Sequence, residues 1–388
     1  MPRCRIRRLF RLPGRPDGTL LVEVILRTLL AALLTLLACP AHAQQRVEEI
    51  PFESVRDFLK LPPDMNFGEV SAVAINSKRH VFVLSRSNIS GPAFGALAGQ
   101  ILEFDPTGKY VREVAKGLYN WSFGHGLRID KDDNIWQVDK GSSTVTKLSP
   151  QGRVLMVFGR KGEASSTGSL APTREPGAPP PAHVDGYFNQ PTDVAWDAGG
   201  NTYISDGYVN SRVAKVDANG DWVKSWGTRG TGPGEFNTPH SIAVDRTGRV
   251  FVADRGNARI QVFDGDGMFL SQFKINVPLP PGARLPIGNT PATPATTGTN
   301  APGSPFVLCI TPGATQYLFA ADNWGRIFKM NLDGQVLGVM GKAGKLHGQF
   351  GQIHGMACPS ENEIYVAEIL NWRVQKLLLN PRRTTTNE

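Results

Sequence analysis

Short runs of β-branched and aromatic residues alternate with turns of glycine, asparagine and aspartate along most of the chain. In one such unit, apolar runs at residues 192–196 and 203–206 precede Asn-x-Arg and a third run from residue 210, and a fourth run lies at 220–224 after a glycine turn. The same order returns from residue 240. Runs of this length and composition between turn residues predict short antiparallel strands, four to each unit.

When the units are aligned with one another, two sets of equivalent positions, here called columns, fix the number of units. The second run of each unit ends in a polar, mostly acidic residue: Ser85, Asp139, Asp206, Asp254, Asp322 and Glu368. Fourteen positions before each of these residues stands the start of the first run: Ser71, His125, Thr192, His240, Leu308 and His354. Six units therefore align without a gap. Repeats of four short strands over about 40–50 residues are typical of propeller blades, so the sequence predicts an all-β fold, a six-bladed β-propeller.

The six units form one predicted domain at residues 44–380. The last unit lacks a fourth run, and we expect residues 52–58, which have strand character, to supply that strand and close the ring. Two segments rich in proline, glycine, serine or threonine, 164–184 and 276–305, fit no blade and are predicted to be insertions between blades. Residues 381–388 are predicted to be a polar tail.

The net charge of +8 is concentrated near the N-terminus. Residues 1–43 hold seven arginines against one aspartate and one glutamate, so the charge of the remaining chain does not argue for a nucleic-acid partner. The apolar run at 29–39 is too short to span a bilayer, and small residues at 41 and 43 resemble a cleavage site. We therefore expect a signal peptide at residues 1–43, export to the periplasm or the medium, and no membrane span. The cysteine at the end of the apolar run, Cys39, could instead carry a lipid anchor.

Three histidines occupy the first column in alternate units. His125, His240 and His354 open the first strands of blades 2, 4 and 6, which lie about 120° apart in a sixfold ring, so their imidazoles can converge on the axis. Three histidines with an open fourth position are typical of catalytic zinc, and imidazole also suits copper, iron or nickel. A single histidine at a strand end is more often a structural residue, but three in one column favour a shared metal ion.

The same face of the disc carries the residues that follow the second strands. Arg86, Lys140, Tyr208 and Arg255 lie one or two positions beyond the acidic column. Arginines beside a metal ion suit a substrate with a carboxylate, and a tyrosine there can act as a general base. The alternatives are that Tyr208 packs over a loop and that Arg255 pairs with a neighbouring acid. The acidic and Asn-x-Arg columns recur in most units, so we expect them to build turns and contacts between blades.

Several segments of the chain carry a family resemblance. They are residues 68–86, 124–127, 190–194, 205–212, 239–241 and 252–261, of which Ser-Asp-Gly-Tyr-x-Asn-Ser-Arg at 205–212 and the three histidines are the most specific. The repeated units resemble NHL repeats. Residues 67–378 as a whole resemble peptidyl-α-hydroxyglycine α-amidating lyase, an enzyme of peptide amidation.

This resemblance implies an activity and roles for the site residues. It implies a zinc ion held by His125, His240 and His354. It also implies that Tyr208 is the catalytic base, that Arg86 is its catalytic partner and that Arg255 binds substrate. The reaction implied is cleavage of the C–N bond of a carbinolamide, such as a peptidyl-α-hydroxyglycine, which gives an amide and glyoxylate. The substrate would be a small molecule or peptide that bears a carboxylate.

Two positions depart from the family pattern. Gln352 replaces an active-site methionine, which leaves the substrate open. Gly355 replaces an aspartate that in the family binds a structural calcium ion together with carbonyls at the positions of Val73 and Leu127, so the sequence counts against calcium.

Other readings of the chain stay open. An exported NHL propeller that binds a protein or glycan without catalysis is the alternative function. A calcium-dependent lactonase would need carboxylate and amide ligands on the axis, where this chain has histidine, serine, threonine and leucine. Cys309 and Cys358 lie beyond the predicted signal peptide, and their pattern does not decide between a disulfide and two buried thiols.

Overall fold

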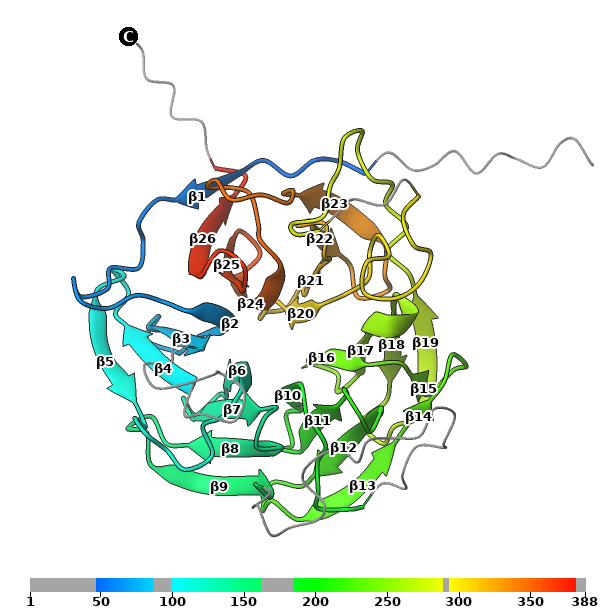
Figure 1. Ribbon diagram of the computed structural model, residues 1–388. Coiled ribbons are helices and arrows are strands. Elements are labelled where there is room, and N and C mark those ends of the chain that lie inside the picture. The colour runs from blue at the N-terminus through cyan, green and yellow to red at the C-terminus, as the bar shows by residue number, and fades with distance from the viewer. Residues whose placement is uncertain (1–46, 87–98, 162–183, 289–292, 382–388) are drawn as a thin grey trace, which may run out of the picture. The chain divides into compact units, whose positions relative to one another are not determined.

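Six four-stranded antiparallel sheets stand around a ring as blades (Figure 1). The computed structural model describes residues 47–86, 99–161, 184–288 and 293–381. The strands of blades 1 to 3 are β2 (Glu69–Ile75), β3 (Val81–Arg86), β4 (Gly99–Phe104), β5 (Tyr110–Val114), β6 (Gly124–Ile129), β7 (Ile135–Asp139), β8 (Thr144–Leu148), β9 (Val154–Gly159), β10 (Asp193–Trp196), β11 (Thr202–Asp206), β12 (Arg212–Val216) and β13 (Trp222–Trp226). The strands of blades 4 to 6 are β16 (Pro239–Val244), β17 (Val250–Asp254), β18 (Arg259–Phe263), β19 (Phe269–Phe273), β20 (Val307–Ile310), β21 (Leu318–Ala321), β22 (Ile327–Met330), β23 (Val336–Met340), β24 (Ile353–Ser360), β25 (Glu363–Glu368), β26 (Arg373–Leu379) and β1 (Phe52–Val55). The predicted six-bladed β-propeller is confirmed.

Two short elements stand apart from the blades. A parallel pair, β14 (Thr228–Arg229) and β15 (Glu235–Phe236), precedes blade 4. A single 3-10 turn, η1 (Arg255–Asn257), follows β17. The described residues contain no helix that is long and apolar enough to cross a bilayer.

The ring is closed by a strand from the other end of the described chain. β1 pairs antiparallel with β26, with Phe52 opposite Leu379, and so supplies the outer strand of blade 6. The amide of Ile50 donates a hydrogen bond to the carbonyl of Val339 at 2.9 Å, so the same segment continues onto the edge of blade 5. The predicted closure is confirmed, with a strand shorter than the expected 52–58. It leaves no free edge on blade 6.

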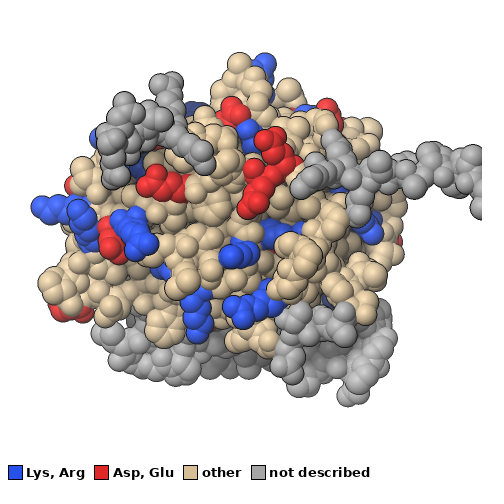
Figure 2. Space-filling model, turned by 90° about the horizontal axis from the view of Figure 1, so that it is seen from above, with Lys and Arg blue, Asp and Glu red and all other residues tan. Residues whose placement is uncertain are grey.

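Within each blade the outermost strand is the most exposed. Strands β7, β11, β17 and β18 are buried at every position, because adjacent blades cover both of their faces. The fourth strands, such as β9 and β13, expose much of their length. Figure 2 shows one side of the molecule, where basic and acidic side chains stand among uncharged residues. Because the buried strands are covered by adjacent blades, the apolar core is divided among the interfaces between blades.

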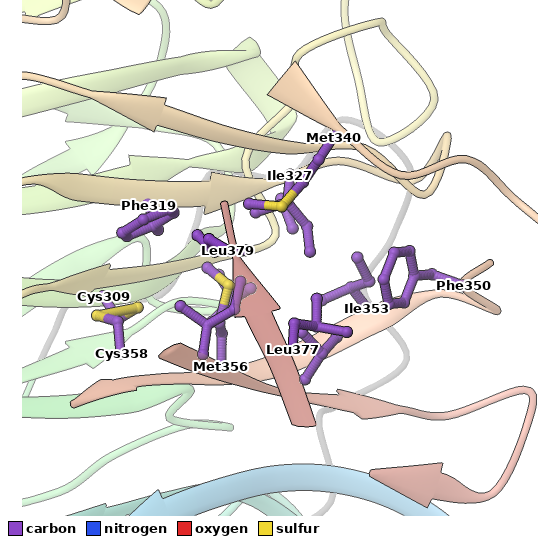
Figure 3. Packing of buried hydrophobic residues seen from close by; sticks show 14 of the residues in the cluster. Cys309, Phe319, Ile327, Met340, Phe350, Ile353, Met356, Cys358, Leu377 and Leu379 are labelled. Atoms are coloured by element: carbon purple, nitrogen blue, oxygen red, sulfur yellow. A yellow bond between two sulfur atoms is a disulfide. The ribbon is translucent and has the colours of Figure 1, made fainter. Parts of the chain in front are cut away.

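The interface between blades 5 and 6 shows how these cores are built (Figure 3). Phe319 and Ile327 of blade 5 pack in one cluster with Met356 of blade 6. Cys309 of β20 and Cys358 of β24 form a disulfide across this interface, with their Cα atoms 6.1 Å apart. The pairing that the sequence left open is therefore a covalent link between two blades.

The acidic column is structural, as predicted. The members that are acidic are fully buried: Asp139, Asp206, Asp254, Asp322 and Glu368. In blade 4, Arg259 donates to the Asp254 carboxylate at 2.7 Å and to the carbonyls of Thr231, Gly232 and Glu235. The pair thus joins the third strand to the segment that leads into the blade. Burial raises the pKa of Asp254 despite these hydrogen bonds.

Of the expected insertions, the second, 276–305, is described except for residues 289–292. The gap between β19 and β20 holds the second insertion, whose residues 293–305 fold back onto blades 4 and 5. There the amide of Gly303 donates to Asp322, and the Ser304 hydroxyl donates to the carbonyl of Arg255 at 2.8 Å. The predicted signal peptide with Cys39, most of the first insertion and residues 382–388 of the tail lie outside the described residues.

Candidate metal centre and active site

The three histidines meet on the axis. Each is the second residue of an innermost strand, β6, β16 or β24, and at each one the pairing with the next strand is interrupted by a register shift. Such a β-bulge re-aims the side chain of the extra residue. Their candidate ligand atoms all lie within 4.8 Å of one another, and the side chains are buried, with 3%, 2% and 7% exposure for His125, His240 and His354.

The Nδ1 nitrogen of each imidazole donates a hydrogen bond to a backbone carbonyl of the neighbouring blade. Nδ1 of His125 donates to the carbonyl of Thr192 at 2.7 Å, and Nδ1 of His240 donates to Phe306 at 2.6 Å. Nδ1 of His354 donates to the carbonyl of Ser71 at 2.8 Å. Because a carbonyl can only accept, the proton is fixed on Nδ1 and the lone pair on Nε2 faces the axis. This arrangement of the outer hydrogen bonds is typical of histidines that bind metal.

The histidines are neutral at ordinary pH. Burial lowers the pKa of His125 and His240 well below the usual value, and nearby positive groups lower both further. Burial together with the charge of Arg86 lowers the pKa of His354 to about 3. A metal ion needs unprotonated imidazole, so the three donors fit a transition metal without a proton to remove.

Tyr208 lies over the histidines. Its hydroxyl is 3.1 Å from Nε2 of His125 and 3.1 Å from Nε2 of His240, so it can donate to either. The residue before it, Gly207, lies against blade 4, where an added Cβ would be 1.8 Å from the carbonyl of Pro239. Glycine therefore lets the chain pass close enough to aim the phenol at the axis.

Three cations surround Tyr208. The Arg86 guanidinium lies 3.9 Å from the Phe123 ring and donates to Glu69 at 2.9 Å. The Lys140 ammonium is 3.7 Å from the centre of the Tyr208 ring, and the Arg255 guanidinium is 5.4 Å from it. The alternative in which Arg255 pairs with a neighbouring acid is not seen in the described chain, which places no carboxylate within ion-pair distance of it. All six predicted site residues thus lie together on one face.

The residues below the histidines do not fit calcium. A Cβ on Gly355 would lie 2.5 Å from the Cα of Ala72, so an aspartate there would clash with the backbone. The guanidinium of Arg128 already fills this part of the channel, with two hydrogen bonds to Asp193 at 2.9 and 2.6 Å and one to the carbonyl of Leu308. The remaining cavity of about 20 Å³ has room for about one water molecule.

The sequence reading did not identify this Arg128–Asp193 pair, although a signal existed. Arg128 lies three positions after the histidine column, where most other units have alanine. Those alanines are Ala74, Ala195, Ala243 and Ala357. A charged residue at a position that is otherwise small and faces the channel requires an internal partner. Asp193, one position after the column in blade 3, is that partner.

Comparison with known proteins gives relatives of two kinds. A sequence profile of the NHL repeat matches residues 236–263. A peptidyl-glycine alpha-amidating monooxygenase of Mus musculus is 32% identical over 222 residues, which are 51% of this chain and 21% of that protein. A probable peptidyl-alpha-hydroxyglycine alpha-amidating lyase of Caenorhabditis elegans is 29% identical over 243 residues, 57% of this chain and 64% of that protein. An NHL repeat-containing protein 3 of Mus musculus is 32% identical over 200 residues, 48% of this chain and 52% of that protein.

The extent of these matches varies. The chain spans about a fifth of the length of the amidating monooxygenases and about half of the NHL repeat-containing protein 3. Among solved structures, a gluconolactonase from Xanthomonas campestris matches with a TM-score of 0.51 and 13% identity, over 81% of this chain and 87% of that one, and shares the fold. The chain is therefore a six-bladed β-propeller that matches the NHL repeat at residues 236–263 and is similar to peptidyl-α-hydroxyglycine α-amidating lyases.

Proposed function

We propose that the protein is a zinc-dependent lyase that cleaves the C–N bond of a carbinolamide, such as a peptidyl-α-hydroxyglycine, into an amide and glyoxylate. The observation that carries the proposal is the set of three buried imidazoles, whose Nε2 atoms converge under the hydroxyl of Tyr208. The names of the lyase relatives support the reaction class.

The chain's own residues provide the groups that the reaction needs. His125, His240 and His354 would hold the zinc ion, which supplies a Lewis acid that lowers the pKa of a substrate hydroxyl. Tyr208, in its deprotonated form, would accept the proton of that hydroxyl and return it to the amide nitrogen as the C–N bond breaks. The carbinol carbon becomes the aldehyde of glyoxylate, so atoms and protons balance. Arg86 and Arg255 bind the carboxylate and hold the carbinol over the axis.

The proposal is tested by metal content and product release. We expect about one zinc per purified chain by mass spectrometry of the metal, and glyoxylate release from an α-hydroxyglycyl peptide. His240→Ala should lose both the zinc and the activity, whereas His347→Ala, at an exposed position, should keep both. A folded wild-type protein free of metal contradicts the proposal. Zinc without glyoxylate release would keep the metal centre and reject the substrate class.

The export of the protein belongs to the same proposal. The disulfide between Cys309 and Cys358 supports it, because disulfides persist in oxidising compartments such as the periplasm. The apolar run and cleavage pattern within residues 1–43 point the same way. N-terminal sequencing of the exported protein tests it, with Gln44 as the expected first residue.

A non-catalytic binding propeller is the second candidate. The similarity to NHL repeat-containing protein 3, whose name states no reaction, favours it. That function needs neither a metal at the three histidines nor the hydroxyl of Tyr208. A protein that binds zinc and releases glyoxylate therefore excludes it.

A further inference from the structure

We infer that the site selects substrates with two acidic groups: the carboxylate at the carbinol carbon and a second carboxylate, on the acyl part, that binds Lys140. The inference rests on the proposed lyase function and names its substrate class. An N-acyl-α-hydroxyglycine whose acyl chain ends in a carboxylate is such a compound.

The position of Lys140 carries the inference. The residue follows β7 in blade 2 and is half-buried between two aromatic rings, 3.7 Å from the centre of Tyr208 and 5.4 Å from that of Phe123. It shares the Phe123 ring with Arg86 and the Tyr208 ring with Arg255. The ammonium therefore stands between the two arginines, directly beside the proposed base.

The charges around this group do not balance. Arg86 is paired with Glu69, but among the described residues no carboxylate lies within 4.0 Å of the ammonium of Lys140 or the guanidinium of Arg255. The Nε of Arg255 is buried without a hydrogen-bond partner in the described chain. Holding unpaired cations together away from water costs free energy. Two anionic groups on one ligand, one at Arg255 and one at Lys140, would offset that cost.

Most other ring-stacked lysines of the described chain have a carboxylate partner, although Lys161, which donates to the carbonyl of Tyr119, does not. Lys329 lies 4.0 Å from the centre of the Tyr317 ring, but it donates to the carboxylate of Glu361. Lys376 stacks on Phe58 and pairs with Glu363. In these pairs the protein supplies the anion. At Lys140 the described chain supplies none, so the anion is assigned to the substrate.

A matched pair of substrates tests the inference. N-succinyl-α-hydroxyglycine and N-butanoyl-α-hydroxyglycine have acyl chains of equal length, and only the first ends in a carboxylate. With the zinc-loaded protein we expect kcat/KM to be about tenfold higher for the succinyl compound, the effect of one charge-assisted contact. In Lys140→Met this ratio should fall to about one. Lys329→Met, which removes a lysine from a tyrosine ring elsewhere, should keep the wild-type ratio.

Three outcomes of this experiment overturn the inference, and two of them concern the ratio itself. One is a wild-type ratio near one. The other is a tenfold ratio that persists in Lys140→Met. An equal loss of rate on both substrates in Lys140→Met also overturns it, because the lysine would then act through Tyr208 and not on the acyl group.

A binding measurement separates this inference from the proposed reaction. By calorimetry, succinate should bind the wild-type protein about tenfold more tightly than butanoate, and Lys140→Met should remove the difference. If neither hydroxyglycine is cleaved but this preference holds, the reaction falls and the selection of two acidic groups stands. If both are cleaved equally and succinate binds no better than butanoate, the lyase stands and the inference falls.

Discussion

The three axial histidines are prepared for a metal ion by contacts that do not involve the metal. Each Nδ1 is held by a carbonyl of the next blade, so the ring orientation is set by the backbone of a neighbour. The β-bulge at each histidine turns the side chain inwards. The same register shift occurs at Ser71 of blade 1, so the repeat becomes a site where the shifted position holds a histidine, in blades 2, 4 and 6.

The hydroxyl of Tyr208 can be removed without disturbing the three donors. In Tyr208→Phe the ring under Lys140 remains, but the proposed base is lost. We expect kcat for glyoxylate release to fall by about 10²–10⁴, with zinc content unchanged. Tyr187→Phe, at an exposed position, should keep the wild-type rate. A Tyr208→Phe enzyme of near wild-type rate would remove the tyrosine from the mechanism.

The buried histidines also predict a pH dependence of stability for the metal-free protein. In the unfolded chain each binds a proton near pH 6.5, whereas in the folded protein their pKa values are lowered, that of His354 to about 3. Below pH 6.5 the unfolded state therefore binds more protons. As the pH is lowered below this value, the free energy of unfolding should therefore decrease by about 1.4 kcal/mol per pH unit for each histidine.

Denaturant unfolding between pH 7 and pH 5 measures this effect, since most carboxylates stay ionised in that range. His354→Gln should reduce the slope of the free energy of unfolding against pH by the contribution of one histidine. An identical slope in the variant and the wild type would show that the histidines titrate alike in both states.

At the scale of the strands, blades 3 to 6 are each held by a buried ion pair as well as by apolar contacts. Arg259 joins Asp254 to the carbonyls of the segment that precedes β16. Arg259→Met leaves a buried carboxylate without its counter-charge and should lower the free energy of unfolding by about 3–5 kcal/mol. Arg246→Met, on the surface, should change it by about 0.5 kcal/mol or less. A small effect of Arg259→Met in urea unfolding would contradict this account.

Strands and blades could be predicted from the sequence because the repeat fixes them together. The acidic column marks the end of the second strand, and its constant spacing from the histidine column sets the register of the first two strands. The bulges could not be predicted in this way, since they depend on how an inner strand meets its neighbours. The repeat marks Arg128 as an exception but does not identify its partner, because Asp193 belongs to the next blade.

At the scale of the whole molecule, one covalent link joins two adjacent blades. The sequence placed Cys309 and Cys358 in consecutive units but could not orient their side chains. The structure pairs them across a loop with a sequence separation of 49. Losing a link of this kind should lower the free energy of unfolding by about 2–4 kcal/mol, because the unfolded chain gains freedom.

Unfolding with and without a reductant checks this value. The wild type should be destabilised by the reductant, and Cys309→Ala/Cys358→Ala should be insensitive to it. A wild type that is equally stable in both conditions would mean that the two sulfurs are thiols.

The closure of the ring by β1 also sets an order of events during synthesis. Ser54 donates a hydrogen bond to Gln375, 321 positions later in the chain, so blade 6 needs residues that are made far apart in time. Until β26 has been made, Phe52–Val55 has no strand to pair with. Blade 6 can be completed only after that strand leaves the ribosome, and this contact of long sequence separation is slow to form. The chain therefore stays incompletely folded until a late stage, which is the state in which a polypeptide can still be threaded through a translocation channel.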